Sequence, residues 1–176
     1  MRYSKRKIFF IGLMVMICVC MLWTMRPVKI IRAGIRFEYD SQFKQGLLIG
    51  SLRGFTDNES YDVIVDHMPL TEWGRIHWYL DHKDELKGKY NIPTSSSYHI
   101  AFWDVGDGFI DGEKSGDGDL VCFNKVDGSN QNCLEKDLLL SVDLDKGEQE
   151  EYTFKHCCNY WSYMPNGRLA WFNGYR

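Results

Sequence analysis

Apolar residues run unbroken near the start of this chain and alternate with polar residues later on. Residues 8–25 carry no charge, and these 18 positions are at the short end of what a membrane-spanning helix needs. Arg26 and Pro27 follow and are expected to end the helix. We therefore predict a transmembrane signal anchor at residues 8–25, preceded by a basic tail at residues 1–7.

Two other interpretations of the apolar stretch are less consistent with its residues. A cleaved signal peptide needs small residues at its cleavage site, and residues 20–27 provide none. A lipoprotein needs a small residue just before its acceptor cysteine, but Cys18 follows Ile17 and Cys20 follows Val19. An uncleaved anchor is the remaining interpretation.

The charge of the chain is distributed unevenly. The first 26 residues contain five basic side chains and no acid, so the remainder carries a net charge of −8 although the whole chain carries −3. The basic cluster before the apolar stretch is denser than the basic residues after it, which favours a cytoplasmic tail and a periplasmic body. The acidic body argues against nucleic acid as a partner, because phosphate binding needs a cationic face.

Residues 67–93, "HMPLTEWGRIHWYLDHKDELKGKYNIP", predict one long helix. Thr71 suits the N-cap, Glu72 suits the positive first turn, and Pro93 follows the expected end. Glu85 and Lys89 are spaced to form an ion pair on the helix surface. Apolar residues at helical spacing form one stripe: Ile76, Tyr79, Leu80, Leu86 and Tyr90.

Most of the remaining body has the alternating pattern of strands, and residues 61–69 are read as a half-buried strand because Val63 and Val65 alternate with acids. Further strands are expected within residues 28–39, 98–104, 119–125 and 137–145, and closing strands within 151–175, with a hairpin turn at residues 165–168. One helix among short strands predicts an α+β fold with a mainly antiparallel sheet. Residues 26–60 form a juxtamembrane strand and an irregular segment, and residues 61–176 form the remainder of the domain.

The body contains four cysteines. Cys122 and Cys133 flank a polar turn, and we predict that they form a disulfide, as expected outside the cytoplasm. Cys157 and Cys158 are neighbours that point to opposite faces of a strand, and their pairing is left open. Zinc is the alternative, but the Cys-x₂₋₄-Cys knuckles of zinc sites do not occur here.

The sequence shows no arrangement typical of catalysis. It contains no Gly-x-Ser-x-Gly, no phosphate-binding loop and no dinucleotide fingerprint. The acidic run of residues 104–119 places Gly106 and Gly108 where a calcium loop needs acids. His77 and His82 are five residues apart, unlike the zinc-binding His-Glu-x-x-His motif. We predict no catalytic residue, metal or cofactor, and do not expect an enzyme.

Trp78 is the unusual residue of the predicted helix. It lies about 200° around the helix axis from Ile76, away from the apolar stripe. Either it folds under the following loop, or it is an exposed anchor for a partner or for the bilayer surface. Trp78 and His82 are therefore the candidate interaction surface.

Several motifs together resemble the DUF943 family of small enterobacterial membrane proteins of unknown function. These are "MPLTEWGRIHWYLDHKDELKGKYNIP", "IAFWDVGDGF", "LVCFNKV" and "NCLEKDLLLSVD", and the resemblance extends from the apolar stretch to about residue 145. The resemblance implies a bacterial inner-membrane protein and supplies no activity or catalytic residue.

Protein–protein interaction at the cell envelope is the function that these observations favour. One form of this hypothesis is a membrane-anchored immunity protein that neutralises a toxin. The alternative is a periplasmic ligand-binding or sensing module, which would show an apolar pocket lined by Trp73, Trp103 or Trp161.

Overall fold

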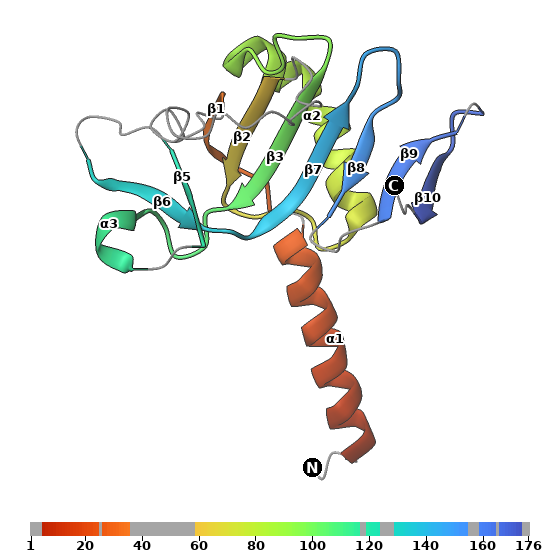
Figure 1. The fold of residues 1–176 in the computed structure, drawn as a ribbon. Helices are drawn as coiled ribbons and strands as arrows, with labels where there is room; N and C mark the ends of the chain where they lie inside the picture. Colours follow the sequence, from red (N-terminus) through yellow and green to blue (C-terminus); the bar gives the residue numbers. More distant parts are fainter. Residues whose placement is uncertain are drawn as a thin grey trace.

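The computed structural model describes residues 5–24, 26–35, 59–116, 119–123, 129–154, 159–164 and 166–173. Within them, a main sheet has the strand order β1-β2-β3-β7-β8-β9-β10 and a second sheet has the order β4-β6-β5 (Figure 1). The strands are β1 (Ile30–Ile35), β2 (Glu59–Val65), β3 (Tyr98–Asp104), β4 (Ile110–Asp111), β5 (Leu120–Cys122), β6 (Gln131–Glu135), β7 (Leu138–Leu144), β8 (Glu151–Thr153), β9 (Asn159–Tyr163) and β10 (Leu169–Asn173). The helices are α1 (Lys5–Thr24), α2 (Glu72–Tyr90) and α3 (Gly112–Ser115).

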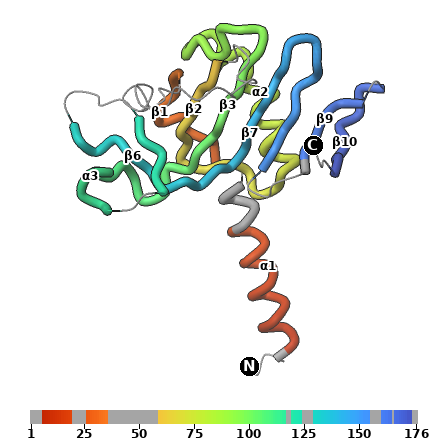
Figure 2. The backbone as a smooth tube through the Cα atoms, viewed as in Figure 1, coloured from red at the N-terminus to blue at the C-terminus, as the bar shows by residue number. Residues whose placement is uncertain are grey.

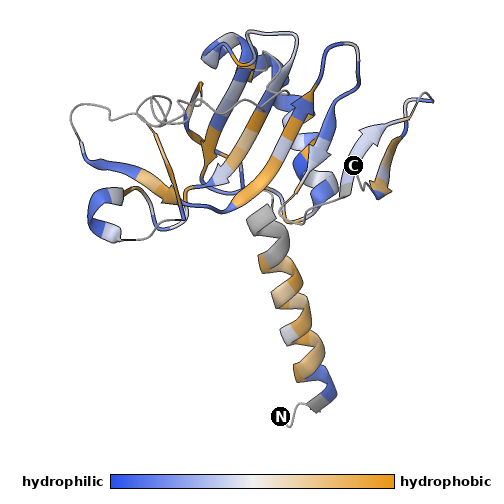
Figure 3. Cartoon of the chain, in the orientation of Figure 1, coloured by the Kyte–Doolittle hydropathy of each residue, from blue (hydrophilic) through white to orange (hydrophobic). Residues whose placement is uncertain are grey.

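Helix α1 projects away from the folded body, as the backbone trace shows (Figure 2). Most of its surface is apolar (Figure 3), and large side chains such as Phe9 and Met14 are 68% and 60% exposed. In the part of the chain that the structure describes, no helix has the length and apolar content needed to cross a membrane.

The predicted boundaries of α2 are confirmed. Thr71 is the N-cap, and its hydroxyl accepts a hydrogen bond from the Gly74 amide at 3.1 Å. Asn91 ends the helix in the left-handed conformation, with φ of 55°, and its amide donates to the Lys87 carbonyl. Gly88 lies inside the helix, two residues before its last residue.

The main sheet is mostly antiparallel, as predicted, but contains one parallel pair. β2 and β3 run in the same direction, and α2 is the crossover between them. From β3 onward the strands β7, β8, β9 and β10 pair antiparallel with their neighbours. The predicted hairpin is confirmed, because Tyr163 pairs with Leu169 across the turn before β10.

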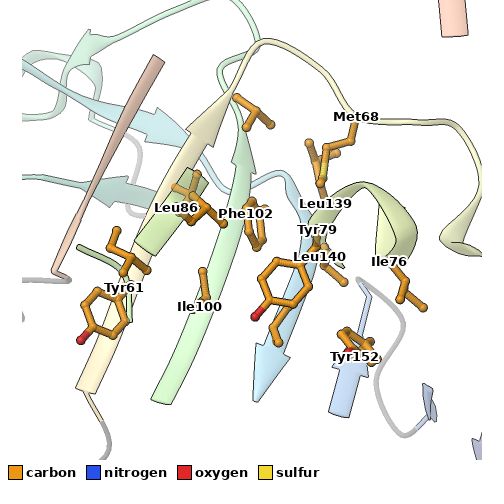
Figure 4. Packing of buried hydrophobic residues seen from close by; sticks show 14 of the residues in the cluster. Tyr61, Met68, Ile76, Tyr79, Leu86, Ile100, Phe102, Leu139, Leu140 and Tyr152 are labelled. Carbon is orange, nitrogen blue, oxygen red and sulfur yellow. The ribbon is translucent and has the colours of Figure 1, made fainter. Parts of the chain in front are cut away.

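One face of the main sheet packs against α2. Tyr61, Ile100, Phe102 and Leu140 from the strands meet side chains of the helix in this core (Figure 4). The predicted apolar stripe supplies Ile76, Tyr79 and Leu86 to it, each at most 1% exposed. The helix therefore lies on the sheet by the face that the sequence indicated.

The opposite face of the main sheet is partly covered as well. Ile64, Ala101 and Trp103 of the main sheet pack there against Leu134 of the second sheet. The strand predicted at residues 61–69 is confirmed over residues 61–65, but the prediction that it is half-buried is wrong, since Asp62, Val63, Ile64 and Val65 are all buried. Both faces of the strand are covered by core side chains. The acids that alternate with its apolar residues therefore do not indicate a face exposed to solvent.

The predicted disulfide is confirmed. Cys122 of β5 lies directly opposite Cys133 of β6, and the two sulfur atoms are bonded. Gly112 of α3 packs closely against this bridge. Cys157 and Cys158 lie outside the described residues, as does most of the irregular segment that was expected before residue 60.

Candidate functional site

A groove of about 540 Å³ lies where α1 joins the folded domain. One wall is the chain segment between α1 and β1, together with the residue that follows β2. The other wall is one flank of α2. Its lining residues are Arg26, Pro27, Val28, Lys29, Ile30, Asp66, Trp78, His82, Glu85, Lys89 and Tyr90.

The two predicted surface residues lie together in this groove. Trp78 and His82 are one helical turn apart, and their rings stack with centroids 4.4 Å from each other. The Trp78 ring also meets Phe102 of β3 edge to face, at 6.0 Å. His82 Nδ1 donates to the Trp78 carbonyl oxygen at 2.7 Å, which makes Nε2 the acceptor of the neutral ring.

Trp78 matches neither of its two expected placements. It is half-buried against the sheet and forms part of the groove, instead of folding under the following loop or projecting into solvent. The exposed tryptophan of α2 is Trp73, at 58%, and it stacks on His77 with centroids 3.6 Å apart. The contact with Phe102 explains the difference, because α2 lies close enough to β3 to cover one side of Trp78.

Asp66 fixes the wall that leads to α1. Its Oδ1 accepts a hydrogen bond from the Lys29 amide at 2.8 Å and contacts His67 Nδ1 at 2.8 Å. Its Oδ2 lies 3.6 Å from the Arg26 guanidinium, and His67 Nε2 donates to the Arg26 carbonyl oxygen. Burial alone raises the pKa of Asp66, but the Lys29 amide, His67 and Arg26 outweigh it and hold the pKa below its usual value.

The rim of the groove carries both signs of charge. Arg26, Lys29 and Lys89 are exposed cations, and Glu85 pairs with Lys89 at 3.7 Å as the helical spacing predicted. Aromatic side chains on a groove wall, inside a rim of charged side chains, suit the binding of an amphipathic segment. The lining residues include no serine, threonine or cysteine, and Tyr90 supplies the one hydroxyl side chain among them.

A second polar cluster surrounds Glu150, on the same side of the sheet as α2. Its carboxylate accepts hydrogen bonds from Lys83 Nζ at 2.7 Å, from Tyr79 at 3.0 Å and from Tyr152 at 2.7 Å, and also from Tyr98. Burial raises the pKa of Glu150, but the hydrogen bonds from Lys83, Tyr98 and Tyr152 outweigh it, so the pKa is lowered. Burial, followed by Glu150, raises the pKa of all three tyrosine hydroxyls. This closed network connects α2 to the sheet.

A histidine, an aspartate and a serine meet on the opposite face of the main sheet. His99 Nδ1 lies 2.6 Å from Asp143 Oδ1 and 3.4 Å from Ser141 Oγ, and Ser141 donates to Asp143. A catalytic triad needs the serine and the acid on different ring nitrogens. Here both approach Nδ1, so the arrangement does not activate Ser141 as a nucleophile.

The tryptophans expected for a ligand pocket have other roles. Trp103 donates to Asp62 at 2.7 Å inside the core, and Trp161 donates to Glu72 at 2.8 Å. Neither these two nor Trp73 lines the groove. Among the described residues, no three histidine, cysteine or acidic side chains are grouped to hold a metal ion.

Sequence reasoning missed the groove wall and the Glu150 cluster. The wall depends on Asp66 and Lys29, which lie 37 positions apart. Glu150 lies 71 positions from Tyr79 and 67 from Lys83. Short sequence motifs do not show which of such distant residues lie together in the fold.

The chain is therefore an α+β domain that follows an apolar helix, with a groove at the junction of the two. The chain belongs to the family described as "Enterobacterial putative membrane protein (DUF943)", whose profile matches residues 3–173. The resemblance seen in the sequence motifs is thereby confirmed over nearly the whole chain. No curated protein and no solved structure matches the chain.

Proposed function

We propose that the chain is a single-pass inner-membrane protein whose periplasmic α+β domain binds another protein through the groove beside α2. The observation that carries this proposal is the Trp78–His82 stack on the groove wall, with charges of both signs around it. Buried aromatic side chains inside a polar rim are typical of the energetically important centre of a protein interface.

Three features support the proposed topology. The family is one of membrane proteins, and the sequence is uncharged over residues 8–25. Side chains on α1 such as Ile8, Phe10 and Val15 are more than half exposed, so α1 has apolar surface to bury. The Cys122–Cys133 disulfide suits an oxidising compartment such as the periplasm.

The topology is tested by reporters fused to the carboxyl end of the full chain. A periplasmic domain makes an alkaline phosphatase fusion active and leaves a green fluorescent protein fusion dark. The opposite pattern would place the domain in the cytoplasm and overturn the topology.

The partner is tested by crosslinking the full-length protein in native membranes and identifying what is captured. We expect one dominant protein with the wild type, its loss with Trp78→Ala, and its retention with Trp73→Ala. The second variant is a matched control, because it removes a tryptophan of the same helix that does not line the groove.

Glu85→Lys is a further variant that avoids the core. Glu85 is 48% exposed on the groove rim, so its reversal changes the charge of the groove and leaves the Trp78–Phe102 contact in place. Capture that is insensitive to both Trp78→Ala and Glu85→Lys would refute the groove as the interface. A captured toxin would support the immunity-like form of the proposal.

A ligand-binding module is the second candidate. The groove volume of about 540 Å³ lies within the range of roughly 300–1,000 Å³ typical of small-molecule sites. If no protein is captured, we expect a small molecule to raise the melting temperature of the wild type but not of Trp78→Ala. Such a shift, seen in the wild type alone, would replace the proposed protein interface with a ligand-binding site in the same groove.

A further inference from the structure

The end of the domain from which α1 projects carries large exposed apolar side chains. Leu70 and Trp73 are each 58% exposed, and Trp171 is 51% exposed. Leu70 lies in the loop before α2, Trp73 in the first turn of α2 and Trp171 in β10. Three exposed side chains of this size at one end of a small domain indicate a surface that meets something other than water.

Two contacts place Trp171 near the first turn of α2, and Leu70 and Trp73 belong to that turn and the loop before it. Trp161 donates from Nε1 to Glu72 Oε2 at 2.8 Å, which links β9 to the first turn of α2. Trp171 pairs directly with Trp161 in the sheet, so the two side chains lie on the same face. Trp73 follows Glu72 in the chain, and the carboxyl end of β10 lies on the side of the sheet from which α1 projects (Figure 1).

The exit of α1 is held at this same end. Arg26 contacts Asp66 through its side chain and His67 through its carbonyl oxygen, and both partners directly follow β2. Thr24 is the last residue of α1, so two residue steps, or about 7 Å of chain at most, separate the helix from Arg26. The headgroup layer on each side of a bilayer is of similar depth, roughly 5–8 Å.

We propose that Leu70, Trp73 and Trp171 form a membrane-contact face that lies in the headgroup region of the bilayer. This inference rests on the proposed function, because it needs α1 to span the membrane. Tryptophan prefers this interfacial region, where its ring is in apolar surroundings and its N–H stays near water. Arg26 and Lys29 lie beside the exit of α1 as exposed cations, which suits lipid phosphates.

The bilayer surface is the occupant that the geometry favours for this face, because the short tether holds this end of the domain close to the headgroups. A domain whose base is fixed within about 7 Å of the end of a spanning helix meets lipid before it meets a soluble partner. The membrane-contact face and the groove involve different flanks of α2, because Trp73 and Trp78 are five positions apart, roughly 140° around the helix axis, and only Trp78 lines the groove. The groove begins beside the exit of α1 at Arg26 and extends along α2 to Lys89 and Tyr90, so contact with lipid at its base leaves the part along α2 accessible.

The test uses the full-length protein in nanodiscs made with phospholipids that carry bromine near the headgroup. Bromine quenches nearby tryptophans, and the sequence places Trp23 near one end of the apolar stretch as an internal reference. We expect the double variant Trp73→Phe, Trp171→Phe to lose roughly two thirds of the lipid-quenched fluorescence, because two of three interfacial tryptophans are removed. Trp78→Phe is the control and should lose much less.

Two further outcomes separate this inference from the proposed function. Equal loss in the double variant and in Trp78→Phe, with the protein still retained in the membrane after carbonate extraction, would overturn the membrane-contact face alone. Release of the wild type by carbonate would overturn both the spanning helix and the face that depends on it.

Discussion

The side chain of Glu150 joins residues that come from α2, β3 and β8. Three tyrosine hydroxyls and the Lys83 ammonium group all donate to this one carboxylate. A charge with so many donors is stable in a largely buried position because each donor replaces a lost water contact. The hydrogen bonds to this one carboxylate therefore hold the helix against the sheet.

Replacing Glu150 with alanine should remove the acceptor that these donors share. We expect Glu150→Ala to lower the free energy of unfolding by about 3 kcal/mol, because the tyrosine hydroxyls and Lys83 lose their partner. Chemical denaturation of the detergent-solubilised chain measures the change. Glu148→Ala, an exposed acid of the same connection, is the control and should change stability by less than about 0.5 kcal/mol.

Gly112 is required for a steric reason. A Cβ atom at this position would lie 2.5 Å from the Cys133 sulfur and 3.3 Å from the Cys122 sulfur. We expect Gly112→Ala to destabilise the protein by about 1–3 kcal/mol and to increase the free thiol measured after folding.

Gly88→Ala is the control for Gly112→Ala, because it adds the same methyl group where no neighbouring atom is close. A Cβ at Gly88 meets nothing within 4 Å, so alanine should raise stability by up to about 1 kcal/mol through its helix propensity. Equal effects of the two substitutions would contradict the steric role of Gly112.

At the scale of elements, the wall between α1 and β1 depends on Asp66. This carboxylate accepts from the Lys29 amide, and the Asp66 amide donates back to the Lys29 carbonyl oxygen. Asp66→Ala should loosen this segment, and we expect trypsin to cleave after Lys29 about tenfold faster than in the wild type. Asp81→Ala, at an exposed position of α2, should leave the rate unchanged. Equal cleavage in both variants would show that Asp66 does not hold the segment.

The sequence predicted the elements whose signals are local. Thr71 and Asn91 cap α2 where the pattern indicated, and β3 occupies the predicted residues. The parallel pairing of β2 with β3 was missed, because nothing within a strand states the direction of its neighbour. The burial of Ile64 was missed for a similar reason, since Leu134, which covers it, lies 70 positions away and belongs to another sheet.

The candidate site was predicted in part. Helical spacing placed Trp78 and His82 side by side, because residues four apart share a face. The opposite wall was beyond such reasoning, because it depends on how β1 pairs with β2 across 23 intervening positions, from Ile35 to Glu59. Helical spacing thus predicted the α2 wall of the groove, whereas the other wall could be identified only from the folded structure.

At the scale of the whole molecule, two carboxylates predict how stability depends on pH. The pKa values of Glu150 and Asp66 lie below their usual values of 4.5 and 3.8. Each ionised group therefore contributes stability that is fully present above its usual value and is lost as the pH falls through the lowered pKa. We expect the free energy of unfolding to decrease from about pH 5 downward. Glu150→Gln should flatten this decrease when unfolding is measured across the range, and an unchanged slope would show that Glu150 does not titrate with folding.

The distribution of strands along the chain also has a consequence for biogenesis. β7, β8, β9 and β10 are added to β3 in chain order, each antiparallel to its predecessor. β3 itself requires the earlier β2 and the crossover α2, because the two strands are parallel. A chain that is synthesised amino end first can therefore build the half that carries the groove before the last strands have left the ribosome, and then extend the sheet one strand at a time.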